Sequence, residues 1–569
     1  MLANNEESAN AKSVEHEFYS PLLKDYRKGK TKYVIVTGSV MSGVGKGTFS
    51  GCLATLLTCH GLKVSPIKFD GYLNYDAGTL NPYRHGEVFV LEDGTECDLD
   101  LGSYERFLNR NLTKDNYLTG GKIFKTIIDK ERSGQYLGRD VQFIPHVVGE
   151  IRSFLRELAM KTDADVVLVE VGGTIGDLEN SYFIEAMREL RYEEGRDNVC
   201  FVNVTYIVEP GSLGEHKSKP AQLGIRTLMG LGVQPDIVIC RSQTPVPNSI
   251  REKISIFSDV PVDRVYNLYD MRNVYDIPLM LRGMGVDRAV FDVLGIGPKK
   301  ASREFTFSDW EAFTDRVKNA AQPVTVGIVG KYTDVHDAYL SILKAVEHAA
   351  PYHDVKAEIR WIESTDIEDG RVDASDALKG VNGIIVPGGF GVRGVEGKIM
   401  AIRYARENNI PFLGLCYGLQ LAVVEFAKNV CGLKGANTTE NDPDTQYPVI
   451  DFLPWQKKLI RENKYGATMR LGGQTVKIKP GTMAYRLYGR DTVVERFRHR
   501  YEVNPEYVKI LEEHGLIFSG GTPDGEIKQI GELPSHRFFI GTQFHPELTS
   551  KPLKPNPLFD GFIQACMKK

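Results

Sequence analysis

The feature that most restricts the fold is a series of short, β-branched apolar runs separated by helical patterns. YVIVTG (33–38) is followed by a glycine-rich loop, by the helical stretch 49–61 and by a second apolar run, VSPIKF (64–69). Further runs of this kind lie at 165–171, 201–208 and 236–240. Such runs are typical of strands buried in a parallel sheet whose crossover helices cover both faces. The sequence therefore predicts an α/β fold built on a doubly wound parallel sheet.

The apolar pattern lapses once and then resumes, which predicts two domains. The second series of runs begins at 324–330 and continues at 357–362, 383–389, 411–416 and 538–544. A chain of 569 residues is long enough for two such domains, each with a full core. We therefore expect a flexible leader over 1–30, a first doubly wound domain over 31–295, a linker over 296–322 and a second doubly wound domain over 323–569.

The composition favours a cytoplasmic protein without nucleic-acid or membrane partners. The formal net charge is −4 with both signs interspersed, so there is no extended basic surface for nucleic acid. The eight cysteines are widely spaced and form no CxxC pair, which fits a reducing compartment. The polar start of the chain does not resemble a signal peptide, and no apolar run approaches about 18 residues.

A cysteine lies at a sharp strand-to-helix turn in the second domain. Gly414-Leu-Cys-Tyr-Gly418 follows an apolar strand and precedes a helical stretch, as in a nucleophile elbow. The helix N-terminus favours the thiolate form of Cys416. Downstream, His545 is placed to accept the thiol proton, and Glu547 to orient the imidazole. A buried inert cysteine and a structural histidine are the alternatives for each residue taken singly, and the combination favours a catalytic triad.

The glycine-rich segment Pro387-Gly-Gly-Phe-Gly391 is the candidate oxyanion hole for this triad. Glycines leave backbone N–H groups unhindered, so that they can bind the oxygen of a tetrahedral intermediate. A plain glycine turn after a strand is the alternative interpretation of this motif when it is considered alone.

The glycine-rich loop of the first domain predicts a phosphate site. It lies between a strand and a helix, where backbone N–H groups and the helix dipole attract phosphate oxygens, and Lys46 would reach the β- and γ-phosphates. The loop departs from the Walker A pattern, because Gly47 follows Lys46 and because Val40 occupies the position of the first glycine.

Carboxylates near this loop are candidate magnesium ligands, since magnesium binds oxygen. Glu170 lies at the carboxyl end of a buried strand, where ligands of α/β sheets gather; a lysine partner is the alternative explanation for its burial. Asp98 and Asp100 are expected on one face of an extended segment. Asp70 and Asp177 are further candidates.

The motifs PGGFG, GLCYGLQ and QFHPE, in that order, resemble those of the class I glutamine amidotransferase domain. The resemblance implies a γ-glutamyl thioester on Cys416 that is hydrolysed to glutamate with release of ammonia. The glutamine-binding positions that it implies are Gly389, Phe390, Gln420, Glu440 and Arg500.

Residues 31 to about 295 are similar to the amidoligase domain of the CTP synthase family. The resemblance rests on SGVGKG, YLGRDVQFIPH, VEVGGTIGD, GEHKSKPAQ and ICRS. It implies a P-loop-like domain in which ATP phosphorylates O4 of UTP and ammonia then displaces phosphate to give CTP, a step of pyrimidine nucleotide biosynthesis.

The same resemblance implies a role for each of several residues. ATP would contact Ser42, Gly43, Val44, Gly45, Lys46, Gly47, Lys68, Asp100 and Arg241. UTP and the product CTP would contact Ser42, Glu179, Lys217, Lys219, Gln222, Lys253 and Phe257. Mg²⁺ would be held by Asp100 and Glu170, and ammonia would pass Pro82, His85 and Val88.

The family further implies GTP as an allosteric activator, because 391–397 resembles its regulatory loop, and a homotetramer that can form filaments. Two other hypotheses stay open from the sequence. One is an amidoligase of similar architecture, such as a cobyrinic acid amidase. The other is a non-catalytic scaffold that binds nucleotides and polymerises.

Overall fold

The computed structural model describes residues 23–211, 214–300, 304–331, 335–389, 391–452 and 469–567. Phe390 and most of the predicted leader therefore lie outside the described residues. The chain forms two compact units: the first holds the residues up to Thr79 and Ser103–Glu311, and the second holds Leu80–Gly102 and the residues from Ala312 onward. The boundary between Glu311 and Ala312 lies inside the predicted linker, 296–322. The segment Leu80–Gly102, which was expected in the first domain, belongs to the second unit.

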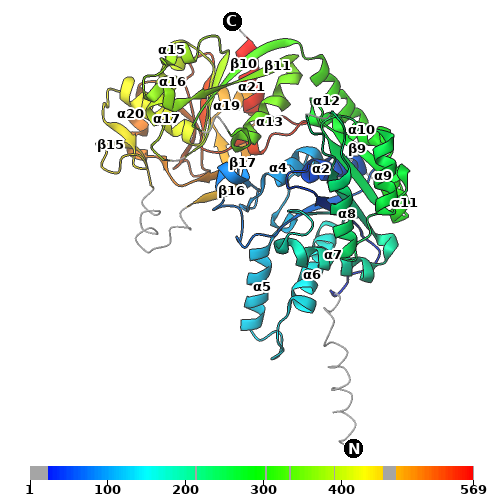
Figure 1. The fold of residues 1–569 in the computed structure, drawn as a ribbon. Coiled ribbons are helices and arrows are strands. Elements are labelled where there is room, and N and C mark those ends of the chain that lie inside the picture. The colour runs from blue at the N-terminus through cyan, green and yellow to red at the C-terminus, as the bar shows by residue number, and fades with distance from the viewer. Residues whose placement is uncertain are drawn as a thin grey trace, which may run out of the picture. The chain divides into compact units, whose positions relative to one another are not determined.

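The first unit contains a seven-stranded parallel sheet in the order β5-β2-β6-β1-β7-β8-β9. Figure 1 shows the ribbon of this unit, with the edge strand β9 labelled. Its strands are β1 (Lys32–Ser39), β2 (Val64–Asp70), β5 (Tyr117–Thr119), β6 (Val166–Val171), β7 (Val199–Tyr206), β8 (Ile237–Ser242) and β9 (Val265–Tyr269). The predicted runs of the first domain are all strands of this sheet, and the parallel α/β class is confirmed.

The helices of this unit lie on both faces of the sheet. Tyr33 and Ile35 of β1 belong to the same buried cluster as α6 and α7, whereas Val34 and Val36 point to the other face, where α2 packs. The main helices are α2 (Lys46–Cys59), α5 (Gly120–Arg132), α6 (Val148–Thr162), α7 (Ser181–Glu194), α8 (Lys219–Gly230), α9 (Asn248–Ser258), α10 (Ile277–Met284) and α11 (Val286–Leu294).

Two helices cross the boundaries between the units along the chain. They are α4 (Leu99–Leu108) and α12 (Phe307–Asn319). The predicted linker therefore contains a helix, and its side chain Trp310 is fully buried, with Nε1 donating to the carbonyl of Tyr275 at 2.7 Å.

The second unit contains a nine-stranded sheet in the order β11-β10-β12-β13-β21-β20-β19-β16-β17. The strands β10 (Gln322–Gly330), β11 (Val355–Glu363), β12 (Gly383–Val386), β13 (Phe412–Leu415) and β21 (Phe539–Thr542) are parallel. The other strands are antiparallel: β16 (Arg470–Ile478), β17 (Thr492–His499), β19 (Ile517–Gly521) and β20 (Lys528–Glu532). The parallel half is the predicted series of runs, and the antiparallel half extends it.

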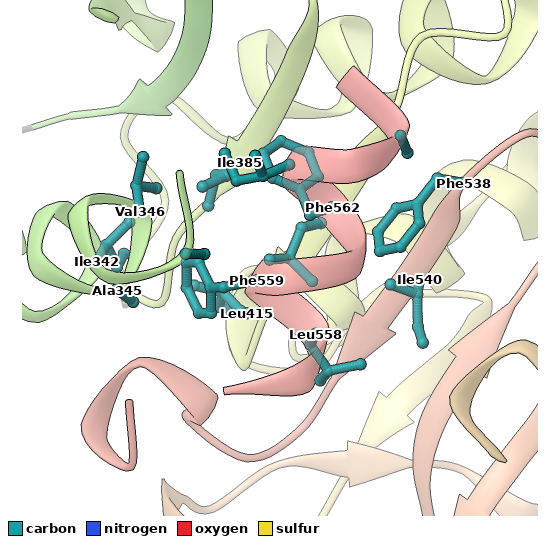
Figure 2. Packing of buried hydrophobic residues seen from close by; sticks show 14 of the residues in the cluster. Ile342, Ala345, Val346, Ile385, Leu415, Phe538, Ile540, Leu558, Phe559 and Phe562 are labelled. Atoms are coloured by element: carbon teal, nitrogen blue, oxygen red, sulfur yellow. The ribbon is translucent and has the colours of Figure 1, made fainter. Parts of the chain in front are cut away.

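Both faces of this sheet are covered by helices as well. Ile385 and Leu415 belong to one core cluster with α13 (Leu340–Ala349) and α21 (Pro557–Met567), and Figure 2 shows Phe559 and Phe562 of α21 in this cluster. The opposite cluster contains α16 (Val395–Glu407) and α17 (Tyr417–Asn429). The strands β13 and β21, which lead to Cys416 and His545, are thus packed by helices on both faces of the sheet.

Smaller elements complete the second unit. They are the hairpin β3 (Phe89–Val90) and β4 (Glu96–Cys97), the three-stranded sheet of β14 (Ala436–Thr438), β15 (Tyr447–Asp451) and β18 (Glu502–Val503), and the helices α3 (Pro82–His85), α14 (Ser364–Glu368), α15 (Ala374–Ala377), α19 (Met483–Tyr488) and α20 (Pro505–Glu513). In the described ranges, the helices are too short or too polar for a bilayer span.

Candidate active sites

Cys416 lies in a strained turn between β13 and α17. Its backbone has φ 51° and ψ −98°, a conformation that costs energy for a residue other than glycine and that clusters at functional sites. The turn is tight, because a Cβ on Gly418 would lie 2.2 Å from the carbonyl oxygen of Val386. The backbone N–H of Cys416 donates to the carbonyl of Thr542 at 2.6 Å, which fixes the elbow to the end of β21.

His545 and Cys416 face the same space above the sheet. The strands β13 and β21 are parallel neighbours, with Leu415 paired to Thr542, so the segments that follow them meet at one edge. A Cβ on Gly388 would lie 3.1 Å from Cε1 of His545 and 3.7 Å from Cβ of Cys416. The nucleophile and the base therefore flank the glycine turn that is the candidate oxyanion hole.

The imidazole of His545 is held by Glu547. Its Nδ1 lies 2.7 Å from Oε1 of Glu547, and both side chains are largely buried. Burial lowers the pKa of His545, but the charges of Glu547 and Cys416 raise it more, so that the pKa is about 10. Among the described residues Nε2 of His545 has no hydrogen-bond partner, and this nitrogen is left to exchange a proton with the nucleophile or the leaving group.

Two further groups contact the sulfur, and the sequence analysis did not single them out. The side-chain amide of Gln543 lies 3.6 Å from Sγ of Cys416, and the main-chain carbonyl of Arg498 lies 3.8 Å from it. Gln543 precedes His545 by two residues within the QFHPE motif, so its position in the motif was the available signal.

Among the predicted glutamine-binding residues, Gln420 lies on α17, the helix that follows the elbow, and Glu440 accepts from the backbone N–H of Gly391. The amide of Gln420 donates to the carbonyl of Tyr501 at 2.9 Å, which leaves its buried Oε1 without a donor in the described part of the chain. Burial raises the pKa of Glu440, and the backbone N–H of Gly391, Lys331 and Arg500 oppose this effect. The Gln420 amide also lies 3.3 Å from Oε1 of Gln543, the residue whose side chain contacts Cys416. Gly389 is exposed.

Lys398 is a buried cation beside this group that sequence reasoning missed. It is 2% exposed, and its ammonium lies 5.6 Å from the centre of the Tyr417 ring. Burial lowers the pKa of Lys398 to about 7, and Lys331 adds to this effect. The residue lies in a helix with an ordinary mixed pattern, so nothing in the local sequence indicated its burial.

The phosphate loop of the first unit ends in Gly45, whose φ of 89° precedes the first turn of α2. Val40, which replaces the expected glycine, has a φ of 82° and so adopts the left-handed conformation that the glycine would favour. Lys46 folds back over Gly38, and its ammonium donates to the carbonyl of Gly173 at 2.6 Å. The exposed Ser42 and Gly43 form the outer part of the loop.

Arg241 at the end of β8 lies beside this loop. A Cβ on Gly45 would be 3.4 Å from Nε of Arg241, and the guanidinium also pairs with Asp270. Lys46, Arg241 and the exposed loop residues Ser42 and Gly43, all predicted to contact ATP, thus lie around the loop that follows β1.

Glu170 has the lysine partner that was its alternative explanation. Lys68 and Glu170 are paired on adjacent strands, their Nζ and Oε1 atoms are 3.3 Å apart, and the Tyr104 hydroxyl donates to the other carboxylate oxygen. Asp70 lies 4.0 Å from the same Lys68 ammonium. The lysine partner by itself accounts for the burial of Glu170, and its role as a magnesium ligand stays a prediction.

The expectation that Asp98 and Asp100 lie on one face of an extended segment is wrong. Asp100 is in the first turn of α4, and its backbone N–H donates to the carboxylate of Asp98 at 2.9 Å. A side-chain oxygen that accepts from a backbone N–H of the first turn stabilises the start of a helix. Within the described ranges, no group of three His, Cys, Asp or Glu side chains converges as a metal site would require.

The predicted UTP residues are only partly brought together. The Lys219 ammonium lies 5.7 Å from the centre of the Phe257 ring, and Arg226, which the sequence analysis did not name, is equally close to it. Gln222 is buried and donates to Ser218. The other four residues are exposed, and Lys217 is paired to Glu215 at 2.7 Å: Ser42, Glu179, Lys217 and Lys253.

The predicted ammonia-passage residues belong to the second unit. Pro82 and His85 form α3, and Val88 is half-buried. The adjacent Glu87 is bound to α13, because its carboxylate accepts from the backbone N–H of Ser341 at 3.0 Å.

Comparison with known proteins places this chain in a family. The family model for the CTP synthase N-terminus matches residues 32–296, and the model for class I glutamine amidotransferases matches residues 334–565. The CTP synthase of Pyrococcus furiosus is 51% identical over 94% of this chain and 98% of its own length. The CTP synthase of Methanocaldococcus jannaschii is 49% identical over 94% of this chain and 98% of its own length.

A solved structure of the Trypanosoma brucei CTPS glutaminase domain with bound acivicin is 39% identical; the match covers 43% of this chain and 94% of that chain, with a TM-score of 0.41. The full-length relatives confirm the predicted resemblance and separate the chain from other amidoligases. This chain belongs to the CTP synthase family and is a glutamine-dependent ligase.

Proposed function

We propose that this chain converts UTP to CTP through a UTP phosphorylated at O4, with ammonia taken from glutamine. The observation that carries the proposal is the position of Cys416 and His545 on either side of Gly388 in a chain of this family. The second support is the loop in which Lys46 and Arg241 flank the N-terminus of α2.

In the glutaminase reaction, the Cys416 thiolate attacks the amide carbon of glutamine. Backbone N–H groups at Gly389 and at Tyr417, the first residue of α17, would stabilise the oxyanion in this proposal. His545 gives a proton to the departing ammonia and then takes one from the water that cleaves the thioester. Glu547 keeps the imidazole in position by holding Nδ1, and glutamate leaves with the thiolate restored.

The side chains that are predicted to bind the substrate glutamine support the proposal. Oε1 of Gln420, which has no donor within the described ranges, is an acceptor for an N–H of the substrate. Glu440 and Arg500 are suited to the α-amino and α-carboxylate groups of glutamine. Phe390 is part of the same proposal by family resemblance.

In the synthase reaction, O4 of UTP takes the γ-phosphoryl group of ATP, and ADP leaves. Lys46, Lys68 and Arg241 neutralise phosphate charge, and Ser42, Gly43, Val44, Gly45 and Gly47 supply the loop around it. Ammonia then adds at C4, phosphate departs with the O4 oxygen, and loss of a proton gives CTP. Bound Mg²⁺ supplies charge neutralisation at the phosphates, and Asp100 and Glu170 would hold it.

The remaining family roles belong to the same proposal. Glu179, Lys217, Lys219, Gln222, Lys253 and Phe257 are proposed to bind UTP and CTP, and Pro82, His85 and Val88 to line the ammonia passage. Lys219 and Arg226 beside the Phe257 ring support a site for a triphosphate. GTP is proposed to activate through 391–397, and the assembly to be a homotetramer.

The deciding experiment is to incubate the chain with UTP, ATP, Mg²⁺ and glutamine and to quantify CTP by chromatography. CTP should form only when all four are present, and ¹⁸O at O4 of UTP should be recovered in phosphate. CTP formation without ATP would refute the proposal, as would retention of the label in the nucleotide.

Regulation and assembly are tested separately. GTP should increase the turnover of glutamine but not that of free ammonia, and light scattering should give the mass of four chains with UTP and ATP. A reducing, cytoplasmic setting belongs to the same proposal, in which the eight cysteines, all within the described residues, form no disulfide with one another.

A further inference from the structure

The backbone of β17 touches both reacting residues of the glutaminase centre. The backbone N–H of His545 donates to the carbonyl of Arg496 at 2.8 Å, and the carbonyl of Arg498 lies 3.8 Å from Sγ of Cys416. The strand β17 is the last of its sheet, so one edge is not paired with another strand of that sheet. Carbonyls two residues apart point to the same side of a strand, and here that side faces the triad.

The side chains of the same two arginines bind the β3–β4 hairpin. Nε of Arg498 donates to Oε1 of Glu96 at 2.7 Å. One terminal nitrogen of Arg496 donates to the carbonyl of Val90 at 3.0 Å, and its guanidinium lies 5.4 Å from the centre of the Phe89 ring. The nitrogen that binds Val90 also reaches the carbonyl of Leu548 at 3.3 Å.

The hairpin is itself fixed to the rest of the second unit. The backbone N–H of Gly473 on β16 donates to the carbonyl of Glu92 at 2.7 Å, and that of Glu87 donates to the carbonyl of Asp337 at 3.0 Å. Val90 and Glu96 are paired across the hairpin, so the two arginine contacts act on one rigid element. A change at Glu96 is therefore transmitted to the edge of β17 rather than absorbed by a loose loop.

We propose that Glu96 is a positioning residue for glutamine hydrolysis, which holds Arg498 and thereby the edge of β17 against Cys416 and His545. The inference rests on the proposed glutaminase function. The Glu96 and Arg498 side chains are 13% and 30% exposed, so the pair is partly shielded and its charge-assisted hydrogen bond has a defined geometry. Without the carboxylate, Arg498 turns towards water, and its carbonyl shifts relative to the sulfur.

The variants that test this proposal are Glu96→Gln, which removes the charge at constant size, and Glu96→Asp, which keeps the charge. Arg496 is 1% exposed and binds two buried carbonyls, so its replacement would destabilise the fold and is not used. The matched control is Glu425→Gln, which removes a buried carboxylate that pairs with Arg406 at 2.8 Å elsewhere in the second unit.

The full chain is assayed for glutamate release, and the alkylation rate of Cys416 by iodoacetamide is followed against pH by mass spectrometry of its peptide. Glu96→Gln should lower kcat by roughly tenfold to a hundredfold with KM within about twofold, since small displacements of reacting groups have effects of this size. The same variant should change the pH profile of alkylation. Glu96→Asp should recover part of kcat, and Glu425→Gln should lower Tm with an unchanged kcat.

Equal kcat values and equal alkylation profiles for Glu96→Gln and Glu425→Gln would overturn the inference and leave the hairpin a purely structural contact. Absence of glutamate release by the unmodified chain would instead refute the proposed function. The alkylation profiles would then still decide whether Glu96 controls the surroundings of Cys416.

Discussion

Nδ1 of His545 lies 2.7 Å from Oε1 of Glu547, and the charge of this carboxylate opposes the lowering of the imidazole pKa by burial. Burial alone lowers the pKa of a histidine, whereas the pKa of His545 is about 10 because the charges of Glu547 and Cys416 outweigh it. Since a free histidine titrates near pH 6.5, the folded state binds the proton more tightly than the unfolded state.

Replacement of Glu547 should therefore change the dependence of stability on pH. The contribution from His545 is fully present below about pH 6.5 and is lost as the pH rises through about 10. The free energy of unfolding of the unmodified chain, measured with urea, should fall between these pH values. For Glu547→Gln the free energy of unfolding should fall less steeply, because the pKa of His545 is lower in that variant. Parallel slopes for the two proteins would contradict the assignment.

Cys416→Ala should abolish CTP formation from glutamine and leave CTP formation from ammonium chloride within about twofold. The thiolate is needed only to release ammonia, so externally supplied ammonia bypasses it. The two activities are measured by chromatography of CTP under the same conditions. Loss of both would mean that the two centres do not divide the reaction in this way.

Lys46→Ala should remove CTP formation from either nitrogen source, because phosphorylation of UTP precedes the attack of ammonia. The Lys46 ammonium, here bound to the carbonyl of Gly173, is the group that we propose to contact the phosphates. Glutamate release should persist and shows that the second unit is folded. Lys63→Ala is the control, because its exposed ion pair with Asp163 lies outside the loop.

Gly388→Ala should lower glutamine turnover by about tenfold or more, because small displacements at a reacting centre have large effects. The added methyl would lie 3.1 Å from Cε1 of His545, tighter than ordinary contacts, so the imidazole must shift. Gly435→Ala, whose methyl would meet its nearest atom at 3.4 Å, is the control and should leave turnover unchanged. Glutamate release is measured for both variants, so that the steric effect at Gly388 is separated from the effect of replacing any glycine by alanine.

Lys398→Met should stabilise the fold at pH 7 by about 1–4 kcal/mol, as the removal of a buried charge often does. The pKa of Lys398 is lowered to about 7 by burial, so between pH 7 and its ordinary value of 10.5 the unfolded state binds more protons and the stability of the unmodified chain rises with pH. The gain measured by urea unfolding should therefore be larger at pH 7 than at pH 9. A gain independent of pH would show that Lys398 does not titrate there.

The positions of the parallel strands and of the cysteine turn were predictable because they depend on short stretches of sequence. The run at 411–416 is apolar throughout and the run at 33–38 is apolar except at Thr37, and glycines at 414 and 418 allow the turn between strand and helix. The strands β16 and β17 escaped prediction because charged and polar residues interrupt them and no continuous apolar run marks them.

The sequence by itself thus determined the α/β class and the positions of the glycine-rich loop and of the cysteine turn, since each depends on neighbouring residues and their periodicity. Only the tertiary structure decided that Asp100 starts a helix, that Lys398 is buried, and that Glu96 reaches Arg498. The physical reason is that these features depend on which distant segments pack together, and burial and pairing of this kind leave no periodic trace in the local sequence.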